Sequence, residues 1–265
     1  MEPKSFRHAS LFTGIGGFDL AASWMGWQNV FQCEIEPFCQ KVLKHHFPQC
    51  EFYEDIRTSD FSKYHGTVEI ITGGFPCQPF SVAGKRKGTD DDRFLWSEMY
   101  RALREVQPRW VVAENVCGLL TLQSGVVFER VCADLENAGY AVQPFIIPAC
   151  AVGAPHRRDR VWIVANADSE RCKGRMFPEK SKKTTNNIIS EFHSFGTWDK
   201  WENNMAQSPV CNRNDGISFG LADITFSKWR KESIKALGNA IVPAVVYQIF
   251  KAINEIETNY GTKKI

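Results

Sequence analysis

The sequence predicts an α/β fold in which a mostly parallel sheet carries helices on both faces. Short apolar segments alternate with longer segments of helical periodicity up to about residue 165. Such alternation is typical of parallel strands joined by crossover helices. The 265 residues, 43% of them hydrophobic and 23% charged, suffice for one large domain, or one large and one small domain. Sheets of this kind bind ligands at the carboxyl ends of their strands, so candidate site residues are expected there.

Several segments have the length and composition of strands. They are HASLF (8–12), VFQCE (30–34), VEIITGG (68–74), RWVVAEN (109–115), VQPFIIPA (142–149) and RVWIVAN (160–166). Helical periodicity occurs in FDLAASWM (18–25), PFCQKVLKHHF (37–47), LWSEMYRALREV (95–106) and VFERVCADLENAGY (127–140). Pro37 suits a first helical turn and Gly139 a helix end.

The composition of the chain changes after Asn166. Residues 171–183 are rich in Lys and Arg, and the polar stretch that follows contains Trp198 and Trp201, with Trp229 near its end. An apolar helical pattern returns near residue 233, and one face of it carries Val242, Val245, Val246, Ile249, Ile253 and Ile256. We therefore predict a main domain of residues 1–165 and 231–265, to which the C-terminal helix returns, and a small domain of residues 166–230.

Composition and charge exclude some classes of protein and leave others open. The net charge of +2 favours no particular partner, so any basic surface must be local. Neither a signal peptide nor an apolar segment of about 20 residues is expected, which predicts a cytoplasmic protein without a membrane partner. The nine cysteines are then expected as thiols, and since none form a C-x-x-C pair, no metal site is expected.

A glycine-rich loop, LFTGIGGF (11–18), follows the first predicted strand. Gly14 and Gly16 fit the dinucleotide pattern G-x-G-x-x-G, but Asp19 occupies the third position. Glu34 ends the second strand, where a carboxylate can accept hydrogen bonds from ribose hydroxyls. These features favour a nucleoside cofactor without a pyrophosphate cradle, such as S-adenosylmethionine. An ordinary tight turn with a solvated glutamate is the alternative from these residues alone.

The stretch GGFPCQPFS (73–81) places a cysteine at the carboxyl end of a strand. Pro76 and Pro79 fix the backbone on both sides of Cys77, and a fixed direction suits a nucleophile. A reactive thiol acts as the thiolate and needs positive surroundings, which the KRK run at 85–87 can supply. A structural turn with an incidental cysteine is the alternative.

Several blocks together resemble the DNA cytosine-5 methyltransferase family. In the family's order, they are LFTGIGG (11–17), GGFPCQPFSVAGKRKG (73–88), ENV (114–116), PHRRDR (155–160) and GNAIVP (238–243). The resemblance covers the chain except roughly residues 166–230. It implies a Rossmann-like class I methyltransferase fold with a mostly parallel mixed sheet, a small target-recognition domain and S-adenosylmethionine as cofactor.

The resemblance also implies a set of catalytic residues. Cys77 corresponds to the nucleophile that attacks C6 of cytosine, and Glu114 to the acid that holds N3 in protonated form, for which a raised pKa is expected. Arg160 corresponds to the residue that holds O2. Arg158 is expected to assist, because alternation on the last strand would place both arginines on one face. His156 stands where the family usually has glutamine, so its role is open.

The resemblance also implies a set of cofactor contacts. Glu34 is implied at the ribose, Asp55 at the adenine amino group, and Asn239 near the methionine end. The remaining implied contacts are the loop residues Phe12, Gly14, Ile15, Gly16 and Gly17, the adenine-packing residues Ile35 and Ile56, and Leu95, which would close the pocket.

The implied substrate is cytosine in double-stranded DNA, turned out of the helix to reach Cys77. The loop from Ser81 to Arg93 is expected to close over DNA, with its basic residues on phosphates. Its candidate DNA-binding residues are Ser81, Lys85, Arg86, Lys87 and Arg93. A cognate restriction endonuclease as a functional partner, a bacterial or phage origin and a monomeric state are further expectations.

Three alternatives remain beside this interpretation. A branch of the family methylates tRNA, and the basic, tryptophan-containing segment does not separate the two substrates. A nucleic-acid-binding homologue without catalysis is disfavoured, because Cys77, Glu114, Arg160 and the glycine loop are all present. A nicotinamide oxidoreductase is disfavoured by Asp19 at the third-glycine position.

Overall fold

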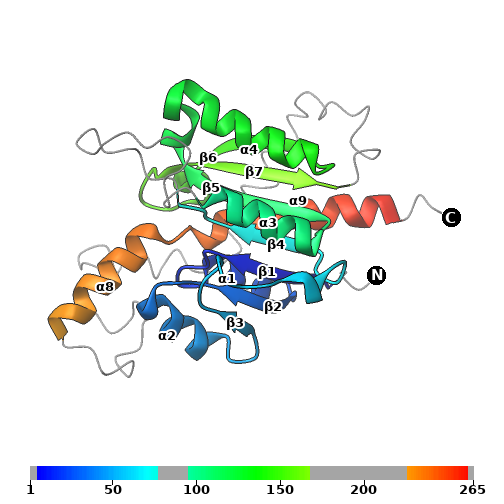
Figure 1. Ribbon diagram of the computed structural model, residues 1–265. Helices are drawn as coiled ribbons and strands as arrows, with labels where there is room; N and C mark the ends of the chain where they lie inside the picture. The colour runs from blue at the N-terminus through cyan, green and yellow to red at the C-terminus, as the bar shows by residue number, and fades with distance from the viewer. Residues whose placement is uncertain (1–4, 77–94, 168–225, 262–265) are drawn as a thin grey trace.

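The computed structural model describes residues 5–76, 95–167 and 226–261 (Figure 1). Their centre is a seven-stranded sheet with the strand order β3-β2-β1-β4-β5-β7-β6. The strands are β1 (Arg7–Leu11), β2 (Gln28–Cys33), β3 (Glu51–Tyr53), β4 (Ile70–Gly73), β5 (Trp110–Val116), β6 (Ala141–Pro148) and β7 (Asp159–Asn166). Of these, β7 runs antiparallel to both of its neighbours, whereas the other pairs are parallel. The predicted α/β class with a mostly parallel mixed sheet is confirmed.

Helices connect the strands and cover the sheet. They are α1 (Gly17–Trp24), α2 (Pro37–His46), α3 (Trp96–Val106), α4 (Val126–Asn137), α8 (Phe226–Asn239) and α9 (Pro243–Gly261), with short 3-10 turns η1 (Ser62–Tyr64), η2 (Cys117–Leu120), η3 (Leu122–Gly125) and η4 (Ala149–Val152). The predicted helices agree with α1 to α4. The short strand β3 was not predicted, since three residues give no readable periodicity.

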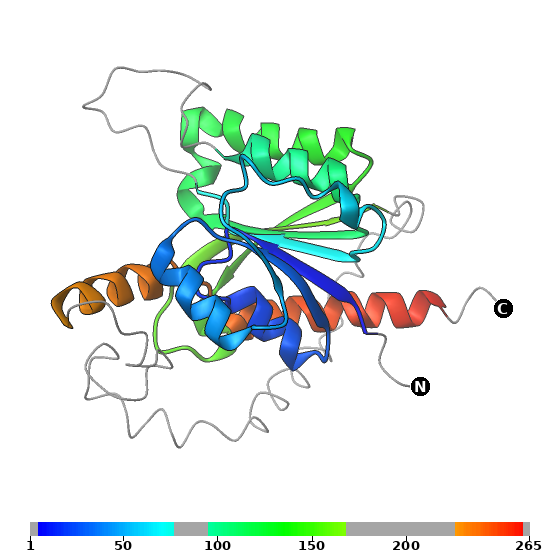
Figure 2. The same cartoon turned by 60° about the horizontal axis from the view of Figure 1, so that its bottom comes forward.

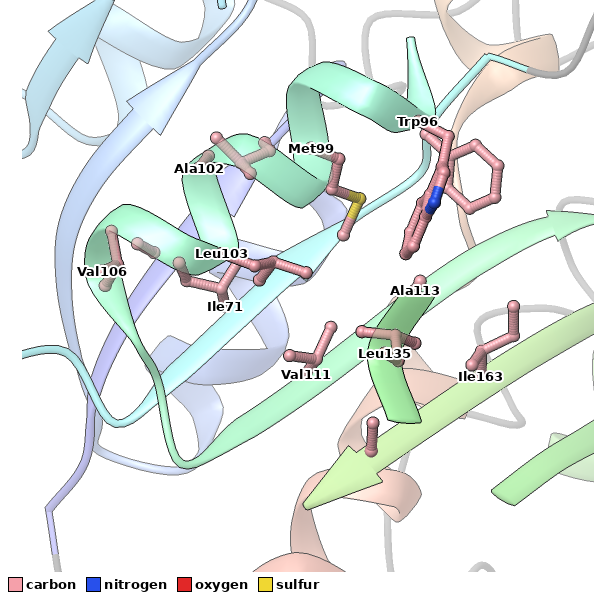
Figure 3. Packing of buried hydrophobic residues seen from close by; sticks show 14 of the residues in the cluster. Ile71, Trp96, Met99, Ala102, Leu103, Val106, Val111, Ala113, Leu135 and Ile163 are labelled. Carbon is pink, nitrogen blue, oxygen red and sulfur yellow. The ribbon is translucent and has the colours of Figure 1, made fainter. Parts of the chain in front are cut away.

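Helices α3 and α4 cover one face of the sheet. Trp96, Met99, Leu103 and Val106 of α3 recur at helical spacing, so one stripe of the helix points at the strands. Figure 3 shows this stripe above β4 and β5, together with Leu135 of α4. The buried side chains shared by these elements form the larger apolar core.

Helices α1 and α9 cover the opposite face, so the C-terminal helix returns to the main domain. In Figure 2 the green α3 and α4 lie above the sheet and the red α9 lies below it. Val245, Val246, Ile249 and Ile253 are buried against residues of α1 and the sheet, as the apolar face predicted. Glu257 pairs with Arg109 and accepts a hydrogen bond from Trp110 Nε1, which ties the far end of α9 to the start of β5.

One segment, Trp229–Thr258, is long and apolar enough to cross a membrane by length and composition alone. This finding differs from the expectation that no such segment exists. The segment is not one continuous helix, because α8 ends at Asn239 and α9 begins at Pro243. The apolar face of α9 is buried in a second apolar core, which α9 forms with α1 and the sheet. We therefore interpret α9 as a core helix of the folded domain.

Candidate active site

A pocket of about 530 Å³ lies at the carboxyl ends of the parallel strands. This volume is within the usual range for sites that hold small molecules and cofactors. Its wall combines the loops after β1, β2, β3 and β4 with the end of β5, the start of β7 and the end of α8. The sheet topology thus brings the separate sequence blocks to one place.

The glycine loop takes a tight path after β1. Phe12, Gly14 and Gly16 have positive φ angles of 52°, 59° and 88°. Glu34 at the end of β2 fixes this path: its Oε2 accepts a hydrogen bond from the Gly14 amide at 2.7 Å, and its Oε1 accepts one from the Glu36 amide at 2.8 Å. Burial raises the pKa of Glu34, while these two amide hydrogen bonds oppose the shift.

Asp19 explains why the third glycine of the dinucleotide pattern is absent. Its side chain is fully buried beneath the loop and accepts hydrogen bonds from Ser10 Oγ at 3.0 Å to each carboxylate oxygen. The Ser10 hydroxyl also lies 2.9 Å from Thr13 Oγ1, so the network reaches the loop itself. Burial raises the pKa of Asp19. The Asp19 side chain therefore stabilises the glycine loop through hydrogen bonds. In the dinucleotide pattern, the glycine at this position instead allows the helix to pack closely on the strand.

Two glycines of the loop are packed against different parts of the chain. A Cβ on Gly17 would lie 2.6 Å from Ile241 Cγ1, so the C-terminal segment packs directly on this position. Gly16 does not line the pocket; a Cβ there would lie 2.7 Å from the ring of Phe47, below the loop. The other predicted cofactor residues all line the pocket: Phe12, Gly14, Ile15, Gly17, Glu34, Ile35, Asp55, Ile56, Leu95 and Asn239.

One part of the pocket combines apolar side chains with a carboxylate. Ile35 lines it with 52% of its surface exposed, beside Ile56 and Leu95. Asp55 lies there too, but its carboxylate accepts a two-point hydrogen bond from Arg57 Nε and Nη2. This contact lowers the pKa of Asp55, which stays charged and retains acceptor capacity for an amino group.

Glu114 and Arg160 lie in another part of the pocket. Arg160 Nε lies 2.8 Å from Glu114 Oε1, and both side chains line the pocket. Burial raises the pKa of Glu114, and the nearby guanidinium of Arg160 opposes this shift. Gly74 lies next to this carboxylate, and a Cβ there would make contact with Glu114 Oε2 at 3.4 Å.

The turn that leads to Cys77 is held by the residue next to Glu114. Asn115 is buried, and its Nδ2 donates a hydrogen bond of 2.9 Å to the Phe75 carbonyl. Phe75 packs against Trp96, and Pro76 lines the pocket. Cys77 follows Pro76 in the chain and lies outside the described residues, as do Ser81, Lys85, Arg86, Lys87 and Arg93.

Arg158 does not lie on the strand as predicted. β7 begins at Asp159, and Arg158 has a φ of 37°, which breaks the alternation that would place both arginines on one strand face. The prediction that both arginines alternate on the strand is therefore wrong. Arg158 and Arg160 nevertheless both line the pocket. Arg158 Nη2 donates to the carbonyls of Gly238 and Ala240, each at 2.8 Å.

Sequence reasoning predicted Asn239 at the end of α8 but missed the contribution of α2 and of the rest of α8 to the pocket. Glu232, Lys235 and Ala236 of α8 line it opposite Phe38 and Cys39 of α2. Lys235 Nζ lies 2.8 Å from Glu36 Oε1 and joins the two helices. Trp229, four residues before Ser233 and seven before Ala236, is buried against α2. This helical spacing of buried residues could have predicted one buried face of α8, but it does not reveal which helix packs against that face. Among the described residues, no group of His, Cys, Asp and Glu is arranged to hold a metal ion.

The sheet order, the reversed β7 and the pocket at the strand ends define the class of protein as an α/β fold with a ligand-sized pocket at the carboxyl ends of its strands. The fold resembles that of the S. pombe Dnmt2 methyltransferase, with a TM-score of 0.61 and 17% identity over 92% of this chain and 97% of that one. Residues 6–213 match the family described as C-5 cytosine-specific DNA methylase. The chain belongs to this family, whose members use S-adenosylmethionine.

Curated relatives agree with this assignment. The chain is 37% identical over 158 residues to the type II methyltransferase M.Eco47II of Escherichia coli, which covers 58% of this chain and 38% of that protein. It is 31% identical over 210 residues to M1.HphI of Haemophilus parahaemolyticus, which covers 76% of this chain and 56% of that protein. The chain thus spans about half the length of these relatives or less.

Proposed function

We propose that the protein transfers a methyl group from S-adenosylmethionine to C5 of a cytosine turned out of duplex DNA, through a covalent bond between Cys77 and C6. The observation that carries this proposal is the contact of the buried Glu114 with Arg160 in the wall of a pocket that is also lined by Pro76, the residue before Cys77 in the chain. The family assignment supports the type of substrate.

Each proposed catalytic residue has a defined task. The Cys77 thiolate attacks C6, and the electron pair of the C5–C6 bond moves into the ring toward N3. Protonated Glu114 stabilises this charge at N3, and Arg160 donates to O2. C5 would then take the methyl group as the methyl–sulfur bond of the cofactor breaks and S-adenosylhomocysteine is released. A base would remove the C5 proton, and that electron pair would re-form the C5–C6 double bond as the thiolate leaves. The raised pKa of Glu114 suits a group that must hold a proton.

The pocket residues fit S-adenosylmethionine, which supplies an electrophilic methyl group when bound. Glu34 would accept from the ribose hydroxyls with the lone pairs that Gly14 and Glu36 leave. Ile35 and Ile56 would enclose the adenine, and Asp55 would accept from its amino group. Asn239 would meet the amino-acid end. A pocket formed by a glycine turn without the third glycine is consistent with a cofactor that has no pyrophosphate.

Two described thiols line the pocket but are poor candidates for the nucleophile. Burial raises the pKa of Cys33 and of Cys39 to about 12, so both stay protonated at neutral pH. Because the thiolate is the reacting form, neither side chain competes with a cysteine in positive surroundings. This comparison excludes the two described thiols of the pocket and leaves Cys77, which follows the pocket residue Pro76 in the chain, as the proposed nucleophile.

Sequencing of DNA from cells that express the chain tests the proposal most directly. Bisulfite conversion or nanopore reads should show 5-methylcytosine at a defined sequence, and the Cys77→Ser variant should show none. The variant should bind the cofactor nearly as tightly as the wild type. DNA with 5-fluorocytosine at the target should give a covalent adduct on a denaturing gel, and an active preparation that gives none would exclude attack at C6.

Methylation of cytosine in tRNA, by the same chemistry, is the second candidate function. Tritiated methyl transfer to duplex DNA and to total tRNA, measured side by side, separates the two substrates. A functional link to a restriction endonuclease predicts that methylated plasmid resists the enzyme that cuts the same site. The target-recognition role of residues 166–230 stays a prediction, because residues 168–225 are not among those described.

A further inference from the structure

Arg158 contacts the C-terminal segment rather than the strand that follows it. Its Nη2 donates to the Gly238 and Ala240 carbonyls, each at 2.8 Å. These two acceptors stand on either side of Asn239, at the point where α8 ends. Carbonyl groups at a helix end lack intrahelical partners, so a charged donor there stabilises the turn. One guanidinium nitrogen therefore holds the backbone on both sides of the residue implied at the cofactor.

The same segment is fixed from its other side by the glycine loop. Gly17 leaves space for Ile241, whose Cγ1 would lie 2.6 Å from a Cβ at this position. Ile241 is partly buried and packs against the core of α1 and α9. The residues 238–241 are thus fixed between Arg158 and the first turn of α1. Without Arg158, only the contact between Ile241 and Gly17 would hold this segment.

Arg158 is also close to the proposed base-binding residues. It lines the pocket with Glu114 and Arg160 and stands two residues before Arg160 in the chain. The carboxylate of Glu114 attracts the guanidinium of Arg158, whereas the guanidinium of Arg160 repels it. A single side chain consequently joins the base end of the pocket to the segment that carries Asn239.

We propose that Arg158 is a positioning residue for the cofactor site, which holds the Gly238–Ala240 turn in place and couples it to the pocket of Glu114 and Arg160. This inference rests on the proposed function for the identity of the ligands. It differs from the expected role of Arg158 as an assistant of Arg160 at the base, because its effect would be present without any nucleic acid.

Calorimetric titration in the absence of DNA tests this role. Arg158→Ala should weaken the binding of S-adenosylhomocysteine at least tenfold and leave the binding of 5′-methylthioadenosine within twofold of wild type. The second ligand lacks the amino-acid end that Asn239 would meet, so a general collapse of the pocket would affect both. Arg158→Lys, which keeps a cationic donor, should recover part of the loss. Arg157→Ala is the matched control, because Arg157 is 82% exposed and does not line the pocket.

Three results would overturn the inference: unchanged binding of S-adenosylhomocysteine to Arg158→Ala, an equal loss for both ligands, or the same loss in Arg157→Ala. Hydrogen exchange gives a readout that needs no ligand. The amides of Ala240 and Val245 donate to the carbonyls of Ala236 and Val242, and their exchange should be faster in Arg158→Ala. Wild-type protein that binds neither ligand would contradict the proposed function; unchanged exchange would overturn the role of Arg158.

Discussion

Glu34 shows how one side chain can support a loop and face a ligand together. Both of its carboxylate oxygens accept backbone amides, one of them in the glycine loop. A carboxylate has more acceptor positions than these two bonds use, so a ribose contact remains compatible with the arrangement. The residue type was predicted from its place at the strand end, but the amide contacts were not.

Replacement of Glu34 by Ala should weaken cofactor binding by about 1.5–3 kcal/mol, the usual cost of losing hydrogen bonds to a charged group. Glu34→Gln should also bind weakly, since its amide nitrogen cannot accept from a backbone amide. Titration calorimetry with S-adenosylhomocysteine measures both. Glu54→Ala is the control, because Glu54 is 73% exposed and outside the pocket; equal affinities for wild type and Glu34→Ala would remove Glu34 from the site.

Glu114 should determine the alkaline limb of the pH–rate profile. Burial raises its pKa, so it keeps its proton to higher pH than an exposed glutamate, and activity falls as pH rises through this pKa. The acid limb should reflect formation of the Cys77 thiolate. Glu114→Gln should be slower but lack the alkaline limb, because its amide donor does not titrate. A profile of kcat/KM from acid to alkaline pH checks this; an alkaline limb that persists in Glu114→Gln belongs to another group.

At the scale of elements, the loop after β1 and the turn between α8 and α9 act as one unit. Their contact depends on the absence of a side chain at Gly17, whose φ is not positive and so does not itself require glycine. Sequence alone suggested close backbone approach to a ligand at this loop. The structure shows that Gly17 also accommodates a protein side chain, Ile241.

Gly17→Ala should therefore displace Ile241 and weaken cofactor binding roughly tenfold or more, with a loss of stability of about 1–3 kcal/mol from overpacking. Gly118→Ala is the matched control, because a Cβ there would make an ordinary contact of 3.8 Å with Val116. Urea denaturation and ligand titration measure the two effects. If Gly17→Ala behaves like Gly118→Ala, the contact with Ile241 can relax at little cost.

The anchor of α9 makes a second prediction at this scale. Glu257 is buried and serves both Arg109 and Trp110. Glu257→Ala should destabilise the fold by roughly 1–3 kcal/mol, because the buried Trp110 loses its acceptor and the partly exposed Arg109 its ion pair. The exposed neighbour Glu255 provides the control, and its Ala variant should have a nearly unchanged urea midpoint. A Glu257→Ala midpoint equal to that of Glu255→Ala would show that α9 is held by apolar packing alone.

For the whole molecule, the pocket depends on parts of the chain that are far apart in sequence. Most of residues 12–18 line it, and so do several residues between 232 and 241, among them Asn239 and Ile241. Ligand binding should consequently slow hydrogen exchange in both segments at once, while the edge strand β6 stays unchanged. Exchange measured by mass spectrometry with and without S-adenosylhomocysteine checks this, and protection of the N-terminal segment alone would contradict a shared site.

Some of the architecture could be predicted from the sequence for clear physical reasons. Buried parallel strands need apolar residues on both faces, so β4 and β5 begin with apolar runs. The direction of β7 could not be predicted in the same way. Periodicity identifies a strand but not its neighbours, and the antiparallel pairing of β7 with β5 and β6 is a property of the assembled sheet.

The sequence by itself determined the fold class, the family blocks and the residue types at the strand ends, because local periodicity, glycine turns and short motifs are properties of neighbouring residues. Only the tertiary structure decided which distant residues meet: Lys235 with Glu36, Ile241 with Gly17, and Arg158 with the turn around Asn239. These contacts depend on how helices and loops far apart in the chain pack onto one sheet, and no local pattern encodes that arrangement.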